Sequence, residues 1–187
     1  EVVNSRQYHA KYNQCVFCSL IDEALTYEAT IYDRESGEIR RKIDVGQYVV
    51  ERGRHFVAIK PFASRYEWEL HILPLEHQAD FLQVTKEQLE DFALVLKRSM
   101  QRLDHVIGGA QYNFFLHSKP HGRDYDNCEE SYHWHLEILP RVTRLAGFEW
   151  GTGFYVNPVA PEDAASFLRD VVAFGAGLTW ASAIVKW

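Results

Sequence analysis

Four potential metal ligands, which lie far apart in the chain, constrain its fold more than any other feature. Cys15 and Cys18 form a Cys-x-x-Cys pair, whereas His77 and His133 come from distant segments. Zn²⁺ prefers four thiolate or imidazole ligands in a tetrahedron, and a Cys-x-x-Cys pair supplies two of them from one turn. Taken alone, His77 is typical of a surface or helix-capping histidine and His133 of a histidine bonded within a sheet. Together with the cysteine pair they predict one zinc ion, at which three segments of the chain must meet.

The segment that follows the last loop alternates between apolar and polar side chains over residues 131–139, as a half-buried β-strand does. One face is apolar and consists of Tyr132, Trp134, Leu136 and Ile138. The other face carries His133, His135 and Glu137. Burial of two imidazoles and a carboxylate costs free energy unless they bind something. Neighbours on one face lie about 6.5–7 Å apart, so a metal at His133 is compatible with a separate chemical group at His135.

The rest of the chain predicts an α+β domain. Thr85 and Gln88 form a capping box ahead of a helical pattern that ends at Gly108. The other predicted elements are a charged hairpin over 28–44, strands within 47–59, over 67–73 and over 112–117, and a helix that begins at Pro161. Strands in a meander with two helices favour an antiparallel sheet with helices packed on one face.

Composition limits the classes of partner. The 187 residues carry a formal net charge of −6, which argues against broad binding to nucleic acid or to an anionic membrane. A phosphorylated small molecule stays compatible, because the local field of a pocket can oppose the net charge. No apolar run approaches the roughly 18–20 residues of a membrane helix, and no signal peptide is visible, so we expect a cytoplasmic protein. The absence of an initiator Met is compatible with a longer natural chain, and Cys128 is expected to be an exposed thiol.

Several motifs resemble the histidine-triad superfamily in kind and in order. They are Cys15-Val16-Phe17-Cys18, Leu73-Pro74-x-x-His77, Tyr112-Asn113 and the segment from His133 to Arg141. A second set more closely resembles the C-terminal half of galactose-1-phosphate uridylyltransferases, and plant-type ADP-glucose phosphorylases share it. That set comprises Pro61-Phe62-Ala63-Ser64-Arg65, Tyr132-His133-Trp134-His135 and Gly147-Phe148-Glu149-Trp150-Gly151-Thr152-Gly153. The resemblance covers residues 1–169 and implies one histidine-triad-like domain over that range.

The resemblance implies a metal site and a reaction. The structural zinc of this half would use Cys15, Cys18, His77 and His133. Bacterial relatives that lack the cysteines use a Glu and three histidines instead, and the matching positions here are Glu1, His117, His133 and His135. Because the cysteines are present, the first set is favoured. The family transfers a uridylyl group from UDP-glucose to galactose-1-phosphate through a uridylyl-histidine, so the expected partners are a nucleotide-sugar and a sugar-1-phosphate.

The nucleophile of the family lies in a His-x-His-x-Gln motif of the first half, and that motif is absent here. His135 occupies the nucleophile position of a single-domain triad protein, but Glu137 replaces the third histidine. The resemblance further implies that Glu149 contacts hexose hydroxyls and that Asn157 lies near another sugar contact. Asn113 and His117, on one strand face, are candidate neighbours of the site, although an edge amide and a surface histidine would look the same. Arg141 and Arg144 either meet a phosphate or stay solvated.

Three functions remain open at this point. The chain is the zinc-bearing C-terminal half of a nucleotidyltransferase, as a homodimer or paired with an N-terminal half. Alternatively, it is a stand-alone histidine-triad hydrolase or phosphorylase that uses His135, or a non-catalytic zinc-stabilised binding module. Residues 170–187 differ in composition from the rest of the chain. They resemble the C-terminal strand pair of a type III β-ketoacyl-ACP synthase but carry none of the catalytic residues of that enzyme. We expect a tail of separate or uncertain origin there and assign it no function.

Overall fold

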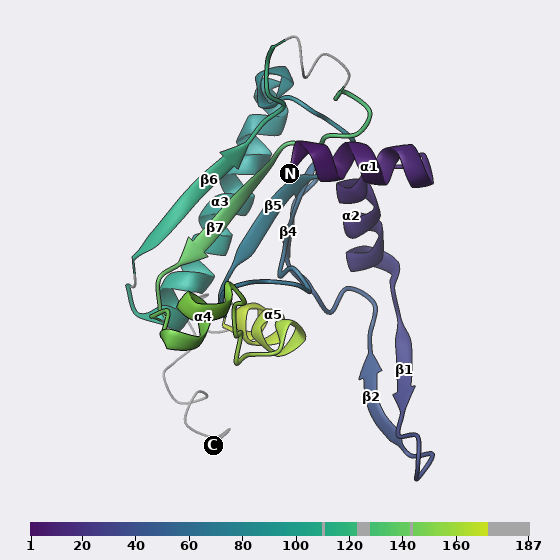
Figure 1. Ribbon diagram of the computed structural model, residues 1–187. Helices are drawn as coiled ribbons and strands as arrows, with labels where there is room; N and C mark the ends of the chain where they lie inside the picture. The colour runs from purple at the N-terminus through teal and green to yellow at the C-terminus, as the bar shows by residue number, and fades with distance from the viewer. Residues whose placement is uncertain (110, 123–127, 143, 172–187) are drawn as a thin grey trace.

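A five-stranded antiparallel sheet forms the centre of the protein (Figure 1). The computed structural model describes residues 1–109, 111–122, 128–142 and 144–171. The sheet consists of β3 (Val49–Arg52), β4 (Phe56–Ile59), β5 (Leu70–Pro74), β6 (Tyr112–His117) and β7 (His135–Pro140). Its strand order is β3-β4-β5-β7-β6. The predicted α+β class is confirmed. Residues 172–187 of the predicted tail lie outside the described residues, so the predicted boundary near residue 170 stays a prediction.

Two helices cover one face of this sheet. The long helix α3 (Lys86–Ile107) begins with the predicted capping box: the Thr85 side chain accepts from the Gln88 backbone N–H, and the Gln88 side chain accepts from that of Thr85. It ends at Gly108, whose φ of 63° is the left-handed conformation that favours glycine. The second helix, α5 (Pro161–Asp170), begins at the predicted proline. Both helices contact β3, and α3 also contacts β4.

The core between these helices and the sheet is centred on one indole. Trp134 is fully buried and packs against Phe56, Phe81 and Phe92, with ring centroids 4.9 to 5.5 Å apart. Aromatic side chains of this size supply most of the apolar area that a core buries. The core therefore fixes the start of β7 against β4 and α3, which sets the position of the neighbouring histidines.

The opposite face of the sheet is also covered, at β4 and β5, by a second helical layer. The N-terminal helices are α1 (Val2–Tyr12) and α2 (Val16–Thr26). Phe17 and Ile21 of α2 pack with Val57 and Ile59 of β4. The expectation of helices on one face alone is therefore incomplete. The physical reason is that β4 is apolar at every position, so both of its faces must be buried.

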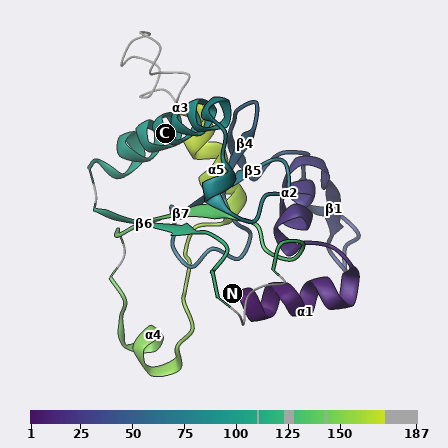
Figure 2. The ribbon, with the colours of Figure 1, turned by 90° about the horizontal axis from the view of Figure 1, so that it is seen from above.

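Two segments extend away from the body. The hairpin of β1 (Ala29–Tyr32) and β2 (Ile39–Ile43) projects from the end of α2, as Figure 1 shows. It confirms the predicted charged hairpin over 28–44. The short helix α4 (Gly147–Thr152) lies on an arm beyond β7, well separated from the sheet in the view from above (Figure 2). Within the part of the chain that the structure describes, none of the helices is long and apolar enough to span a membrane.

The strand predicted over 131–139 is shorter than expected and begins only at His135. The backbone N–H groups of Ser131 and Tyr132 both donate to the carbonyl of Cys128, which closes a turn in place of a sheet ladder. Tyr132 consequently leaves the face of Trp134 and packs its ring against Phe17, with centroids 6.1 Å apart. Cys128 itself is fully buried, so the expectation of an exposed thiol was wrong. The loop turns inward because the Cys128 carbonyl accepts hydrogen bonds from the backbone N–H groups of Ser131 and Tyr132.

Candidate functional site

The four predicted metal ligands converge at one point. Cys15 precedes the first residue of α2 and Cys18 lies in its first turn, while His77 follows β5 and His133 precedes β7. The Cys18 sulfur lies 3.3 Å from Nδ1 of His77 and 3.4 Å from Nδ1 of His133. All four donor atoms lie within 4.8 Å of one another. In an ideal zinc tetrahedron a sulfur and a nitrogen lie about 3.6 Å apart, so the two distances from Cys18 are close to those of a zinc site.

The outer nitrogens of both histidines hold the rings in the correct tautomer. Nε2 of His77 donates to the carbonyl of Glu129 at 2.6 Å, and Nε2 of His133 donates to that of Pro74 at 3.0 Å. A carbonyl can only accept, so each Nε2 carries the proton and each Nδ1 presents a lone pair to the cysteine sulfurs. This is the usual outer support of metal-binding histidines.

The two thiols also behave as a ligand pair. The hydrogen bond from Cys18 lowers the pKa of Cys15 well below that of an ordinary thiol, while the same interaction raises the pKa of Cys18. One sulfur is thus readily ionised, and ionisation of the second is opposed by the negative charge of the first. A divalent cation between them would remove that repulsion.

A second cluster lies beside the first on the same sheet face. The Glu1 carboxylate contacts Nδ1 of His117 at 3.0 Å and Nε2 of His135 at 3.1 Å. Tyr132 donates its hydroxyl to the same carboxylate at 3.1 Å. The two imidazole rings stack with centroids 4.8 Å apart. Glu1, His117 and His135 belong to the alternative metal set. His133 does not join them, because its Nδ1 faces the Cys18 sulfur. The alternative four-ligand set is therefore split.

His135 is closed to a substrate in this arrangement. Its side chain is fully buried, and Nδ1 donates to the carbonyl of His133 at 3.0 Å. In the neutral ring, Nε2 then carries only a lone pair, and that lone pair faces the Glu1 carboxylate. Such a contact is attractive only when a proton or a cation lies between the two atoms. Nucleophilic attack by Nε2 would require the Glu1 side chain to leave.

Glu137, which stands in place of the third histidine, is the centre of an ion-pair network. It contacts Arg65 at 3.1 Å and lies 3.6 Å from both His71 and His117. Hydrogen bonds to Glu1 and Glu137 raise the pKa of His117 to about 9. The hydrogen bond from His117, which outweighs the effect of burial, lowers the pKa of Glu137. Glu1, Glu137, Arg65 and His117 are therefore charged partners that neutralise one another.

The comparisons with known proteins agree with this geometry. The chain is 34% identical over 124 residues to an ADP-glucose phosphorylase of Arabidopsis thaliana, covering 66% of this chain and 35% of that protein. It is 27% identical over 172 residues to a galactose-1-phosphate uridylyltransferase of Thermotoga maritima, covering 88% and 47%. A comparison with models of known protein families finds no match. The chain thus spans less than half the length of these two curated relatives.

Solved structures show the same relationship. The crystal structure of an Arabidopsis thaliana ADP-glucose phosphorylase with bound ADP-glucose superposes with a TM-score of 0.70 at 26% identity, covering 90% of this chain and 47% of that one. A zinc-bound histidine triad family protein of Mycobacterium smegmatis superposes with a TM-score of 0.51 at 18% identity, covering 85% and 93%. The chain has a histidine-triad fold. Its homologues support the galactose-1-phosphate uridylyltransferase family.

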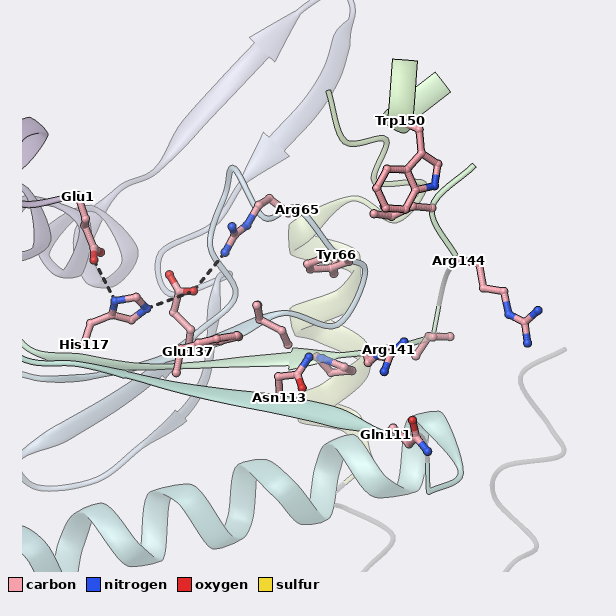
Figure 3. A pocket seen from close by; sticks show the side chains of 15 residues that line it. Glu1, Arg65, Tyr66, Gln111, Asn113, His117, Glu137, Arg141, Arg144 and Trp150 are labelled. Atoms are coloured by element: carbon pink, nitrogen blue, oxygen red, sulfur yellow. Dashed lines mark hydrogen bonds and ion pairs between the residues drawn. The ribbon is translucent and has the colours of Figure 1, made fainter. Parts of the chain in front are cut away.

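A cavity of about 1210 Å³ adjoins the second cluster of this histidine-triad fold. Figure 3 shows its wall, with the linked side chains of Glu1, His117, Glu137 and Arg65 at one end. Asn113 and His117, both predicted near the site, line this cavity from β6. The fully buried His135 is absent from its lining.

The structure places the remaining predicted substrate residues in structural contacts. Glu149 accepts from the Ala146 backbone N–H at 3.0 Å and so caps α4. The Asn157 amide donates to the carbonyls of Ser64 and Tyr66 at 3.3 and 3.4 Å, which ties the loop after β4 to the segment before α5. Whether either side chain also contacts a sugar remains a prediction.

Arg65, Glu69 and His71 belong to the network but were not predicted as site residues. His71 lies opposite Glu137 in the pairing of β5 with β7, and Glu69 contacts its ring at 3.0 Å. The sequence contained a signal for Glu69 and His71, because residues 67–73 alternate and place them on one face of a strand.

Proposed function

We propose that this chain is the zinc-bearing half of a nucleotidyltransferase of the galactose-1-phosphate uridylyltransferase type, and that the nucleophilic histidine lies on a separate half. One observation carries the proposal: the histidine at the nucleophile position, His135, is buried, with Nδ1 bonded to a carbonyl and Nε2 facing the Glu1 carboxylate at 3.1 Å. Glu137 replaces the third histidine of the triad. This half thus keeps the fold and a metal site while its own imidazole is closed to substrate, which argues against a stand-alone hydrolase.

The proposed reaction is a two-step transfer. An imidazole of the partner half attacks the nucleotidyl phosphorus of UDP-glucose, which gives a uridylyl-histidine and releases glucose-1-phosphate. Galactose-1-phosphate then attacks the same phosphorus, forms UDP-galactose and frees the histidine. One relative of the chain is an ADP-glucose phosphorylase. ADP-glucose with phosphate is therefore the second substrate pair to test. The contribution of this half would be architecture and contacts to sugar phosphate rather than the covalent step.

Cys15, Cys18, His77 and His133 would hold one zinc ion in this half. Their donor geometry and the carbonyl support of both histidines favour this ion. Four protein ligands leave no open position, so the ion would have a structural role.

The free edge of the sheet supports the pairing of two halves. β6 is the last strand in the sheet order, and no strand among the described residues pairs with its outer side. Apolar side chains cover this edge and are 44 to 47% exposed: Tyr112, Phe114, Phe115 and Leu116. An edge strand with several exposed apolar side chains is a template for another strand. A partner half, or a second copy of this chain, would continue the sheet here.

The test reconstitutes the two halves. The chain is assayed alone and with a separately expressed half that carries a His-x-His-x-Gln motif, using UDP-glucose with galactose-1-phosphate and ADP-glucose with phosphate. We expect no turnover and no covalent nucleotide adduct for the chain alone, and turnover for the pair. His135→Asn, with its fold and zinc content verified, should leave the activity of the pair largely intact. Release of nucleoside monophosphate by the chain alone, abolished by His135→Asn, would instead establish the hydrolase. A stable pair that has no activity would leave only a binding module.

A further inference from the structure

A second cavity, of about 400 Å³, opens beside the two cysteines of the candidate metal site. It shares no lining residue with the cavity of Figure 3. The side chains of Cys15 and Cys18 both line it. The rest of its wall comes from α1, from α2 and from the connection between them, and consists of Tyr8, Gln14, Ser19, Asp22 and Glu23. The two sulfurs are therefore open to a small molecule on a side of the protein that the proposed transfer does not use.

The two cysteines differ in exposure. Cys15 is only 5% exposed and packs in an apolar cluster with Phe17 and Ile21, whereas Cys18 is half-buried. Their sulfurs lie within 4.8 Å of each other. Cysteines that sense oxidants pair an accessible thiolate, which reacts first, with a second thiol close enough to resolve the product. Cys18 meets the first condition and Cys15 the second.

The position of the pair at the start of a helix suits a disulfide. Cys15 precedes the first residue of α2, and Cys18 lies in its first turn. Redox-active Cys-x-x-Cys pairs have the same spacing. The third cysteine, Cys128, is fully buried and is not among the clustered donor atoms. Within the described chain, Cys15 is therefore the partner for an oxidised Cys18.

The charge of the cavity selects the oxidant. Asp22 and Glu23 are both exposed, and neither lysine, arginine nor histidine is found among the described residues that line the cavity. Two carboxylates without a lining cation create a negative potential at the entrance. An anionic oxidant such as glutathione disulfide is repelled there, whereas neutral hydrogen peroxide is not.

We propose that Cys18 is a site of oxidation by hydrogen peroxide and that Cys15 resolves the product to a disulfide, so that the pair gives up its metal ion. The inference rests on the zinc site of the proposed function and adds a modification that the proposed reaction does not involve.

The chemistry takes place in two balanced steps. The Cys18 thiolate attacks one peroxide oxygen, so an S–O bond forms, the O–O bond breaks and hydroxide leaves. The Cys15 thiolate then attacks the sulfur of this sulfenic acid, so the S–S bond forms and a second hydroxide leaves. The sulfurs lose two electrons in total, the peroxide gains them, and two protons from water convert both hydroxides to water.

The disulfide cannot replace the metal ion as a cross-link. After oxidation only His77 and His133 of the four donors remain, which is too few for a tetrahedral zinc site. The ion would join segments as far apart as Cys18 and His77, which are separated by 59 residues. The disulfide closes a loop within one turn and restricts the unfolded chain far less. Peroxide should therefore destabilise this half of the enzyme, and a thiol reductant with zinc should restore it.

The test treats the zinc-loaded chain with an excess of hydrogen peroxide in the presence of a zinc-binding dye. We expect release of one zinc ion per chain together with loss of two of the three thiols. Peptide mass spectrometry should place the disulfide between Cys15 and Cys18 and find Cys128 unmodified. Dithiothreitol with zinc should restore both the thiols and the urea midpoint.

Charge variants test the selection of the oxidant. Glutathione disulfide should release zinc more slowly than peroxide does. Asp22→Asn/Glu23→Gln should speed the release by glutathione disulfide by roughly threefold and leave the peroxide rate unchanged. The matched control is Glu90→Gln/Asp104→Asn, which removes two exposed carboxylates from α3 and should change neither rate. Circular dichroism and the urea midpoint of the reduced, loaded variants confirm that each is folded.

The outcomes separate the inference from the proposed function. A purified chain without zinc contradicts the proposed metal site, and the inference with it. A chain that holds one zinc ion and keeps it in peroxide overturns the inference alone. Release of zinc with all thiols intact, or sulfinic acid on Cys18 without a disulfide, also overturns it. A rate with glutathione disulfide that does not change in Asp22→Asn/Glu23→Gln contradicts selection by charge.

Discussion

Removal of the proposed zinc ion should abolish most of the stability of this domain. The ion would join Cys18 to His77, which are 59 residues apart, and His77 to His133 over a second loop of similar length. Each closure of this length restricts the unfolded chain by the equivalent of about 4 kcal/mol at 25 °C. The two closures together contribute about 8 kcal/mol, which is comparable with the whole stability of an ordinary domain.

The measurement is urea unfolding of the zinc-loaded and the chelated protein. With a slope of about 2 kcal/mol per M, a loss of 8 kcal/mol lowers the midpoint by about 4 M. The chelated protein should therefore be largely unfolded without urea. The fluorescence of Trp134, which is fully buried in the core, and far-ultraviolet circular dichroism report the transition. Elemental analysis of the loaded sample should give one zinc ion per chain.

Cysteine variants provide the matched comparison. Cys18→Ser removes a proposed ligand and should leave a protein whose stability hardly responds to chelation. Cys128→Ser removes a buried thiol outside the cluster, and the difference between loaded and chelated protein should persist. Equal midpoints for the loaded and the chelated intact chain would refute the reasoning, because the two closures would then contribute nothing.

Three further predictions concern single side chains. Gly53→Ala should lower the free energy of unfolding by about 1–3 kcal/mol in urea titrations, because the added Cβ would lie 2.5 Å from Oδ2 of Asp91. An unchanged urea midpoint would show that the Asp91 carboxylate moves freely. Burial lowers the pKa of Lys60 to about 7. Between about pH 7 and 10.5 the unfolded state therefore binds more protons than the folded state, and the contribution of Lys60 to stability rises with pH over that window. Lys60→Met should remove this rise and raise the free energy of unfolding at pH 6 by on the order of 2 kcal/mol; a loss at pH 6 would contradict it. The pKa of His117 is raised to about 9, so its contribution to stability is complete below about pH 6.5 and is lost as the pH rises through 9. Thermal unfolding should show that His117→Gln destabilises the protein at pH 6 and has little effect above pH 9.5. An equal effect at both pH values would exclude the ion pairs as the cause.

The elements that the sequence predicted well depend on local signals. The capping box of Thr85 and Gln88 and the left-handed Gly108 are set by neighbours within one turn, so both ends of α3 could be predicted. The convergence of the four candidate metal ligands could be predicted for a different reason. Core packing does not require thiol and imidazole side chains, whereas a tetrahedral zinc ion requires donors of this kind.

Features that depend on tertiary contacts could not be predicted. The start of β7 is delayed because the carbonyl of Cys128 takes the backbone N–H groups that a longer strand would use. No periodicity reveals such a competition. The Glu1 carboxylate likewise meets His117 and His135 across more than a hundred residues of chain. The resemblance grouped Glu1 with both histidines as an alternative metal set, but nothing in the sequence indicated that the carboxylate would face Nε2 of His135.

The carbonyl contacts behind His77 and His133 form a reciprocal clamp. His77 follows β5 and is held by the loop before β7, at Glu129, while His133 precedes β7 and is held by the end of β5, at Pro74. In the folded chain, each segment thus orients the donor atom of the other. Metal binding and the folding of these two segments should therefore occur together. Conversely, any movement that separates these two segments would open the metal site and the neighbouring histidine cluster together.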